Sequence, residues 1–513
     1  MPVAYTRRRP AVPSHRHGRR AAVAAAAACL AHGAAGQTWK FNPQLGLEET
    51  LTNNVKLESN ELRHGDLVTQ LTPGFLFSER SAHTKIDGSV FVPVLFYART
   101  GSENKVVPNV SIVGTAELVE RLFFIEGSIL VDQQYLTPFG PRSDITSISQ
   151  NRYTSQTYRI TPYLKGSAGT DLDYELRDDN IWTKGNSGVV NDAYTNQLTG
   201  HLRRTPRPFG WELDVQRSST KFQDQSKQLL ELARARGLYA VDPQLELSAS
   251  AGYEHNDLLV ETKDDFIYGV GAQWHPTERT NVEAAWEHRF FGGSYHFAFD
   301  HRTPLSVWSI SASRDITTLP QQLASLPGGV DVNAALNRLF QSRVTDPVQR
   351  EALVNQIIQN RGLPQFLTQP VSLYSQQVQL QESLLATVGF LGVRNTTFLT
   401  AYRLRVEPIS GSGNPLPPEL SFLENNTQYG GSVVWSHSLT GLTALTASVD
   451  GSRTVLNDQP GVTKQVVVKL GLTTLVAPLT SLYGGVRYQG ARSDITNDYN
   501  EAAVFVGVNH RFN

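Results

Sequence analysis

Apolar and polar side chains alternate along short segments through most of this chain. In residues 266–275, aromatic and aliphatic side chains occupy every second position. In the last segment, residues 500–512, the alternate positions from Ala502 to Val508 are apolar and Phe512 follows them. A period of two predicts β-strands with one apolar and one mixed or polar face. The repetition of such segments predicts an all-β fold.

The connections between these segments alternate between short and long. Short turns are expected near residues 79–84, 119–121, 165–169, 205–208, 242–244, 276–280, 303–304, 389–394, 438–441 and 477–480. Mostly longer and more polar connections are expected near residues 53–66, 99–107, 135–152, 184–192, 221–226, 258–264, 318–371, 408–425, 457–463 and 493–499, with a tight corner at 291–293 on the same side.

This alternation is typical of a barrel in a membrane, where tight turns occupy one rim and longer loops the other. Lipid supplies no water to an unpaired sheet edge, so the sheet must close on itself. We therefore predict a transmembrane up-and-down antiparallel β-barrel of about 22 strands, within a range of roughly 18–24, with both termini at the rim of short turns.

One connection, residues 319–370, is far longer than the others. Two apolar sets within it have helical spacing, Val332, Leu336, Leu339 and Phe340 and then Val348, Leu353, Ile357 and Ile358. Asp331 and Asp346 are expected N-caps, with Pro347 at the first position of the second helix. Gly362 is expected to follow its end. A loop this long is usually functional or disordered, and we expect it either to fold into the lumen or to cover the mouth.

The N-terminus has the composition of an export signal. Basic residues from Arg7 to Arg20 precede a short apolar run at residues 21–31, and small residues follow it. This order predicts a signal peptide at residues 1–36. The one cysteine, Cys29, would be removed with it, so we expect no disulfide in the mature protein.

Residues 37–513 are predicted to form a single barrel domain, because no change of composition divides them. The mean hydropathy is −0.28, and no apolar run after the N-terminus approaches the ~20 residues of a spanning helix. A net charge of −1 among 513 residues gives no reason to expect a nucleic-acid partner.

No nucleophile elbow, phosphate-binding loop, paired-cysteine motif or zinc motif occurs in the sequence. We therefore expect no catalytic residue, no metal ligand and no cofactor. Charged side chains on the polar strand faces are instead candidates for lining a hydrated lumen: Glu175, Arg177, Glu212, Asp214, Glu246, Glu254, Glu283, Glu287, Arg289, Asp300, Arg302 and Arg314. Such residues either tune which solutes pass or simply keep the lumen hydrated.

Several stretches of the first strands resemble a known family. Residues 48–57 read EETLTNNVKL and residues 66–74 read DLVTQLTPG, while residues 122–128 read LFFIEGS and residues 157–164 read TYRITPYL. These stretches resemble the PEP-CTERM-system-associated outer-membrane β-barrel family, most strongly in the first third of the chain. The resemblance implies a Gram-negative outer-membrane location and a link to exosortase and exopolysaccharide systems. It implies no catalytic residues.

Three functions remain open. The first is an integral outer-membrane barrel that acts as a passage or docking component in polysaccharide export. The second is a surface-binding or adhesion barrel that acts through its long loops. The third is an outer-membrane hydrolase using paired carboxylates such as Glu283 and Glu287, which a mixed-charge lumen explains more simply. The expected partners are membrane lipid, the barrel-assembly machinery through the C-terminal strand, and exopolysaccharide.

Overall fold

The structure is a computed structural model. It describes residues 38–186, 190–223, 226–258, 261–325, 331–341, 343–372, 374–409 and 424–512. The predicted signal peptide, residues 1–36, lies outside the described residues. In the part of the chain that the structure describes, no helix is both long and apolar enough to cross a membrane.

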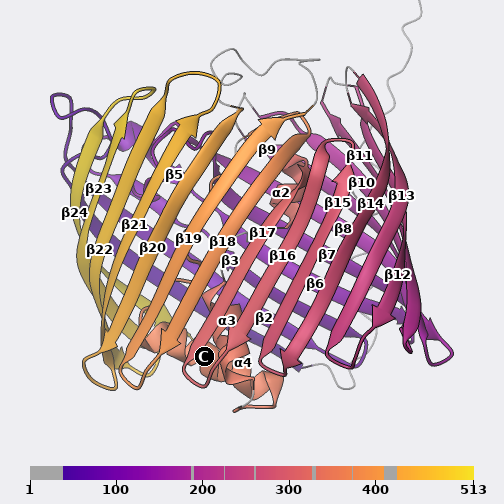
Figure 1. Ribbon diagram of the computed structural model, residues 1–513. Helices are drawn as coiled ribbons and strands as arrows, with labels where there is room; N and C mark the ends of the chain where they lie inside the picture. The colour runs from indigo at the N-terminus through magenta and orange to yellow at the C-terminus, as the bar shows by residue number, and fades with distance from the viewer. Residues whose placement is uncertain are drawn as a thin grey trace, which may run out of the picture.

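One antiparallel sheet closes into a barrel through the pairing of its first strand with its last (Figure 1). Its strands are β1 (Thr38–Thr52), β2 (Asp66–Arg80), β3 (Thr84–Phe91), β4 (Val94–Tyr97), β5 (Lys105–Val106), β6 (Asn109–Val119), β7 (Phe123–Tyr135), β8 (Arg152–Ala168), β9 (Leu172–Gly185), β10 (Ala193–Arg204), β11 (Phe209–Phe222), β12 (Gln228–Ala240), β13 (Leu245–Leu258), β14 (Glu261–Thr277), β15 (Thr280–Arg289), β16 (Gly292–Arg302), β17 (Ser306–Thr317), β18 (Gln379–Leu391), β19 (Asn395–Pro408), β20 (Asn426–Ser438), β21 (Thr443–Leu456), β22 (Val462–Ala477), β23 (Thr480–Ser493) and β24 (Tyr499–Arg511).

Two neighbouring wall strands are each broken once, at the same level of the barrel. Pro93 separates β3 from β4, and Pro108 separates β5 from β6. β3 pairs with β6 on one side of the break, and β4 pairs with β5 on the other. Proline has no N–H to donate to a ladder, so the regular pairing is interrupted where Pro93 lies opposite Val107 and Pro108 lies opposite Val92. Each broken pair of segments is one wall strand, so the barrel has 22 strands, as predicted.

The connections alternate as the sequence predicts. Turns of two to four residues join β2 to β3, β6 to β7 and every second pair thereafter up to β22 and β23. They form one rim, called here the turn rim, where β1 begins and β24 ends. The opposite rim, the loop rim, contains the other connections, including the one with the 3-10 helix η1 (Gly101–Glu103).

Large apolar side chains cover the outside of the wall. On β11, Leu213 and Val215 are 44% and 51% exposed, and on β24, Val504 and Val506 are 57% and 59% exposed. Leu213 and Val215 alternate along β11 with the inward Glu212, Asp214 and Gln216. Exposed aliphatic side chains on strand after strand would be unstable in water, and they match the lipid-facing band of a membrane-spanning barrel.

The described parts of the long connection after β17 enter the barrel at the loop rim and reach the turn rim (Figure 1). Helix α2 (Leu319–Ala324) packs against β8, β9 and β10 near the loop rim. Helices α3 (Val332–Phe340) and α4 (Pro347–Asn360) lie at the turn rim (Figure 1). They form an apolar cluster with Val307, Leu391, Phe398 and Val434 of the wall.

The sequence predictions for this insertion hold in part. Asp331 caps α3 through a hydrogen bond to the N–H of Asn333, and α4 begins at Pro347 as predicted. The predicted end of the insertion at residue 370 is wrong, because β18 begins only at Gln379. Val371 lies in the lumen, where the Gln428 side chain bonds both its backbone N–H and its C=O. Side-chain pairing inside a lumen leaves no periodicity that a sequence pattern could reveal.

The lipid-facing band makes Val506→Arg costly. Val506 lies midway along β24, pairs with Glu49 and Gly484, and points outward. We expect the arginine to make the barrel folded in phospholipid vesicles less stable by about 2–4 kcal/mol, because its charge must leave water. Denaturant titration of folding into vesicles measures this cost.

Asn509→Arg is the matched control, since it adds the same charge to the inner face of the same strand. Its cost should stay within about 1 kcal/mol. Equal costs for both variants would contradict a lipid-facing assignment for Val506.

Candidate functional site

The lumen is the most chemically distinctive part of the structure. Eleven of the twelve predicted lumen residues share the wall face opposite the exposed apolar residues: Glu175, Arg177, Glu212, Asp214, Glu246, Glu254, Glu283, Glu287, Arg289, Asp300 and Arg302. Asp300 and Arg302 contact α3, through Arg338 Nη1 at 2.5 Å and Gln341 Oε1 at 3.1 Å.

Arg314 lies on the other face, so its prediction as a lumen residue is wrong. It is opposite Tyr295 of β16 and Glu382 of β18, and it shares the outer face of β17 with the exposed Trp308. Its guanidinium turns back to donate to the carbonyl of Gly293 at the loop rim. A long cationic side chain can reach the aqueous rim from an outward position, so charge alone does not identify the inner face.

A ladder of alternating charges crosses β10 to β15 on the inner wall. It contains three arginines and four carboxylates, Arg203, Arg234, Arg236, Glu212, Asp214, Glu246 and Glu287. Both oxygens of Glu246 accept from Arg203 Nη2 at 2.8 Å. Arg234 bridges Asp214 at 3.1 Å and Glu287 at 2.6 Å.

These ladder side chains remain in contact with solvent. Arg203 and Arg236 are each 27% exposed, and Arg234 is 17% exposed. Partial exposure means that the ion pairs contribute little to stability individually. The ion pairs instead hold charges of both signs at fixed positions along a water-accessible surface.

Two further ion-pair groups extend this charged wall. Towards the loop rim, Arg289 holds the buried Glu254 through Nη2 at 2.8 Å and Nε at 2.9 Å. On β7 to β9, Glu126 lies between Arg159 and Arg177, with Arg177 at 3.5 Å. One side of the lumen, from β7 to β15, is therefore lined by paired charges.

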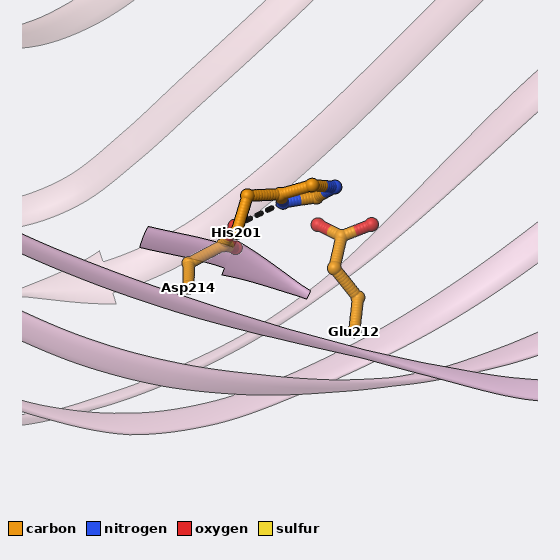
Figure 2. A group of neighbouring side chains, drawn as sticks. All are labelled: His201, Glu212 and Asp214. Carbon is orange, nitrogen blue, oxygen red and sulfur yellow. Dashed lines mark hydrogen bonds and ion pairs between the residues drawn. The ribbon is translucent and has the colours of Figure 1, made fainter. Parts of the chain in front are cut away.

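His201, Glu212 and Asp214 form a compact group within the ladder (Figure 2). One ligand atom from each lies within 4.8 Å of the others, and His201 Nδ1 is 2.8 Å from Asp214 Oδ1. Such a set could in principle bind a cation. Both carboxylates already contact Arg236, so the positive charge that a metal ion would bring is present. The geometry favours an ion-pair function for this group.

The connection between β7 and β8, residues 136–151, crosses the lumen to the opposite wall. Arg142 donates to Tyr402 Oη at 2.7 Å and to Gln428 Oε1 at 3.0 Å. The Gln465 side chain holds the loop backbone at two points, accepting from the N–H of Arg142 and donating to Gly140 O. This segment, called here the crossing loop, narrows the lumen.

Asp144 is the main ionic anchor of the crossing loop. Its carboxylate lies 3.2 Å from Lys469 Nζ and 3.1 Å from Arg487 Nη1. Burial raises the pKa of Asp144, but the two cations outweigh burial and hold that pKa well below its ordinary value. Arg487 also pairs with the fully buried Glu501 at 2.8 Å. The crossing loop is thus tied to β22, β23 and β24.

A cavity of about 990 Å³ lies between the crossing loop, the insertion and the wall from β18 to β24. Its lining mixes apolar, polar and charged side chains, and it includes seven glutamines: Gln133, Gln134, Gln322, Gln369, Gln381, Gln465 and Gln489. Tyr402, Tyr483 and Phe505 add aromatic surface. Among the described residues, Gln322 Oε1 and Gln489 Oε1 are buried without a hydrogen-bond partner. The cavity therefore presents polar groups that water or a ligand can satisfy.

Sequence reasoning missed the ladder arginines and every residue of the crossing loop. Arg203, Arg234 and Arg236 sit on the inner face by the same alternation that identifies Glu212, so the pattern could have found them. Arg142 and Asp144 lie in a polar loop without periodicity. Only their long-range partners distinguish an inward loop from an outward one.

No protein-family model matches the chain, and no curated protein matches it. Among solved structures, the outer membrane protein OpdK from Pseudomonas aeruginosa aligns with a TM-score of 0.35 and 10% identity over 92% of this chain and 99% of that one. The siderophore receptor PirA from Acinetobacter baumannii aligns with a TM-score of 0.47 and 8% identity over 92% and 80%. The FrpB iron transporter from Neisseria meningitidis gives 0.39 and 9% over 92% and 82%. Scores and identities this low support no conclusion about solute or partner.

Loss of the ionic anchor should release the crossing loop. Ser143 is 4% exposed, so a Ser143→Cys thiol should react slowly with a water-soluble maleimide in the folded barrel. Adding Asp144→Asn should raise the labelling rate by about tenfold, because the neutral amide no longer attracts Lys469 and Arg487. The control is Asp458→Asn, a loop-rim carboxylate bonded only to Asn425 among the described residues.

The low pKa of Asp144 also predicts how the loop responds to acid. A depressed carboxyl pKa contributes stability that is complete above the unfolded-state pKa and is lost as the pH falls towards the folded-state pKa. Labelling of Ser143→Cys, normalised to the unfolded chain, should therefore stay flat from neutral pH to about pH 5. Labelling that accelerates within this range would contradict the anchor.

The ladder should set ion selectivity. Arg234→Gln removes one lumen cation and leaves Asp214 and Glu287 less neutralised, so the cation-to-anion permeability ratio should rise roughly twofold. Reversal potentials across a salt gradient measure this ratio. Arg217→Gln removes an equivalent charge from the outer face of β11, where Arg217 pairs with Glu231, and should leave the ratio unchanged.

Proposed function

We propose that this protein is an outer-membrane channel that passes hydrophilic solutes through a gated lumen. The observation that supports this most is the combination of a lipid-facing exterior with a solvent-accessible interior of paired charges. An exterior of this kind requires a bilayer, and the partly exposed ladder marks a hydrated route along β7 to β15.

The proposed orientation follows from the rims. In outer-membrane barrels the tight turns face the periplasm and the longer loops face outward. The turn rim, with β24 ending there, is therefore assigned to the periplasm, and the loop rim to the cell exterior. This arrangement agrees with the export signal expected at residues 1–36 and with recognition of β24 by the assembly machinery.

The proposed solute class is a neutral or weakly charged saccharide. The cavity lined by the glutamines offers amide donors and acceptors that suit hydroxyl groups. Tyr483 and Phe505 supply aromatic surface against which the apolar face of a sugar ring can pack. The stretches at residues 48–57 and 66–74 that resemble the PEP-CTERM-associated family support an exopolysaccharide as that saccharide.

The insertion is proposed to act as the gate. α3 and α4 close over one part of the turn rim, and their contact with the wall is an apolar cluster strengthened by the Arg338–Asp300 ion pair. Two pairs of elements define the passage: α3 and α4 at the turn rim, and the crossing loop with α2 nearer the loop rim. A shift of α3 would widen the periplasmic exit without disturbing the wall.

A surface-binding barrel is the alternative. The polarity and length of loop-rim connections such as residues 53–65 support this alternative. A hydrolase has less support, because Glu212, Asp214 and Glu287 each pair with arginine. A carboxylate neutralised in this way is a poor general base.

Displacing α3 from the apolar cluster at the turn rim tests whether this helix closes the channel. Ala335 is 1% exposed in the cluster at the turn rim, and Ala335→Asp would place an unpaired carboxylate there. We expect single-channel conductance in planar bilayers to rise severalfold, and swelling of proteoliposomes in neutral oligosaccharides to accelerate. The matched control, Gln356→Asp, adds the same charge to an exposed position of α4 and should behave as the unmodified protein does.

Deletion of residues 319–370 provides a second test of the same gate. Absence of conductance and of swelling in the unmodified protein, in Ala335→Asp and in the deletion would contradict the channel and favour the surface-binding alternative. Heat-modifiable migration on gels identifies variants that have folded.

A further inference from the structure

A row of cationic side chains crosses the outer face of five adjacent strands close to the loop rim. Direct cross-strand pairing links Arg403 of β19 to Tyr429 of β20, Tyr429 to Arg453 of β21, Arg453 to Lys464 of β22, and Lys464 to Arg492 of β23. All five point outward, since Tyr429 is 43% exposed and the inward neighbours Gln428 and Thr454 are buried. We call these residues the cation row.

Three members of the row have no counter-charge within the described part of the chain. Arg403 pairs with Glu382 at 2.5 Å. For Arg453, Lys464 and Arg492, no ion pair or hydrogen bond to a described residue occurs, and all three are exposed. Their Cβ atoms are directly opposite across the ladder, about 5 Å apart, where like charges repel and destabilise the sheet. An anion bound between them would remove that repulsion.

An apolar groove of about 590 Å³ begins on the same outer wall below the row. Val468, Leu470, Val486, Tyr488 and Val504 line it, together with other residues of β1 and β22 to β24. Val468 is four residues from Lys464 along β22, which corresponds to about 13 Å. The cation row and the groove therefore lie on one surface, and the distance between them is about the length of a small lipid headgroup.

Between the row and the groove the outer surface recedes. Gly451 and Gly490 flank Val466 there, in direct cross-strand register. A Cβ added at Gly451 would meet no atom within 4 Å, whereas one at the buried Gly490 would approach Tyr499 O at 3.3 Å. The wall thus leaves space for bulk at Gly451, directly beneath Arg453.

From this geometry we propose that the outer wall of β19 to β24 binds one phosphorylated lipid of the outer leaflet. Its phosphate groups lie among Arg453, Lys464 and Arg492, and an acyl chain lies in the groove. Charge complementarity selects the phosphate, and the adjoining groove selects an amphiphile over a free anion. The assignment of the leaflet uses the proposed orientation of the loop rim, whereas the binding itself is independent of transport through the lumen.

Native mass spectrometry of the detergent-purified barrel with added diphosphorylated lipid A tests the site. We expect the double variant Lys464→Gln/Arg492→Gln to bind this lipid at least about tenfold more weakly, since two charge-assisted contacts are lost. The control Lys184→Gln/Lys221→Gln removes two exposed outward lysines near the loop rim on the opposite wall, and should change the affinity less than about twofold.

Three further measurements make the outcome decisive. Dephosphorylated lipid A should bind the unmodified protein as weakly as diphosphorylated lipid A binds the double variant. Ala502→Trp, which fills the groove, should also weaken binding. The charge-preserving variant Lys464→Arg/Arg492→Lys should bind diphosphorylated lipid A as the unmodified protein does, which shows that substitution at these two positions leaves the wall folded. Equal binding by unmodified protein and double variant, equal binding of the two lipids, or competition by inorganic phosphate at the concentration of the lipid would each overturn the proposal. If the double variant loses lipid binding but keeps the conductance of the unmodified protein, the lipid site is tested independently of the proposed channel function.

Discussion

The pairing of every backbone N–H and C=O in the wall is the constraint on which the rest of the structure depends. An unpaired backbone group in hydrocarbon costs several kcal/mol, so the sheet must close, and β1 pairs with β24 along nine residue positions from Gln44 to Thr52. Interruptions in the ladder occur where prolines leave no N–H to pair, as at Pro93 and Pro108. Closure then fixes an even strand number, both termini at one rim, and an alternation of faces along every strand.

Closure of this many strands creates a lumen too wide for wall side chains alone to fill. The protein fills it with two segments from the loop rim, the crossing loop and the insertion, which meet where Tyr374 N–H donates to Leu136 O. Their packing divides the interior. From β7 to β15 the wall exposes paired charges, and from β18 to β24 it encloses a glutamine-rich cavity with apolar and charged side chains in its lining. The two regions of the lumen therefore differ in chemistry.

Charge has opposite meanings on the two faces of this wall. Inside, arginines and carboxylates neutralise one another in pairs, so water and fixed counter-charges stabilise them together. Outside, Arg314 and the cation row lie near the loop rim, where long side chains reach water or headgroups. Their outward positions would be costly at the middle of the bilayer.

Local alternation within the sequence determines the barrel, the approximate strand number, the two rims and the inner position of residues such as Glu212 and Glu287, because a period of two is a local property of a strand. Helical spacing and caps likewise determine α3 and α4. Tertiary structure alone decides that the insertion and residues 136–151 fold inward, that Arg142 reaches Tyr402, and that Arg453, Lys464 and Arg492 stand side by side. The physical reason is that these contacts join residues far apart in the chain, and their energies depend on register and closure, which no local pattern of side chains encodes.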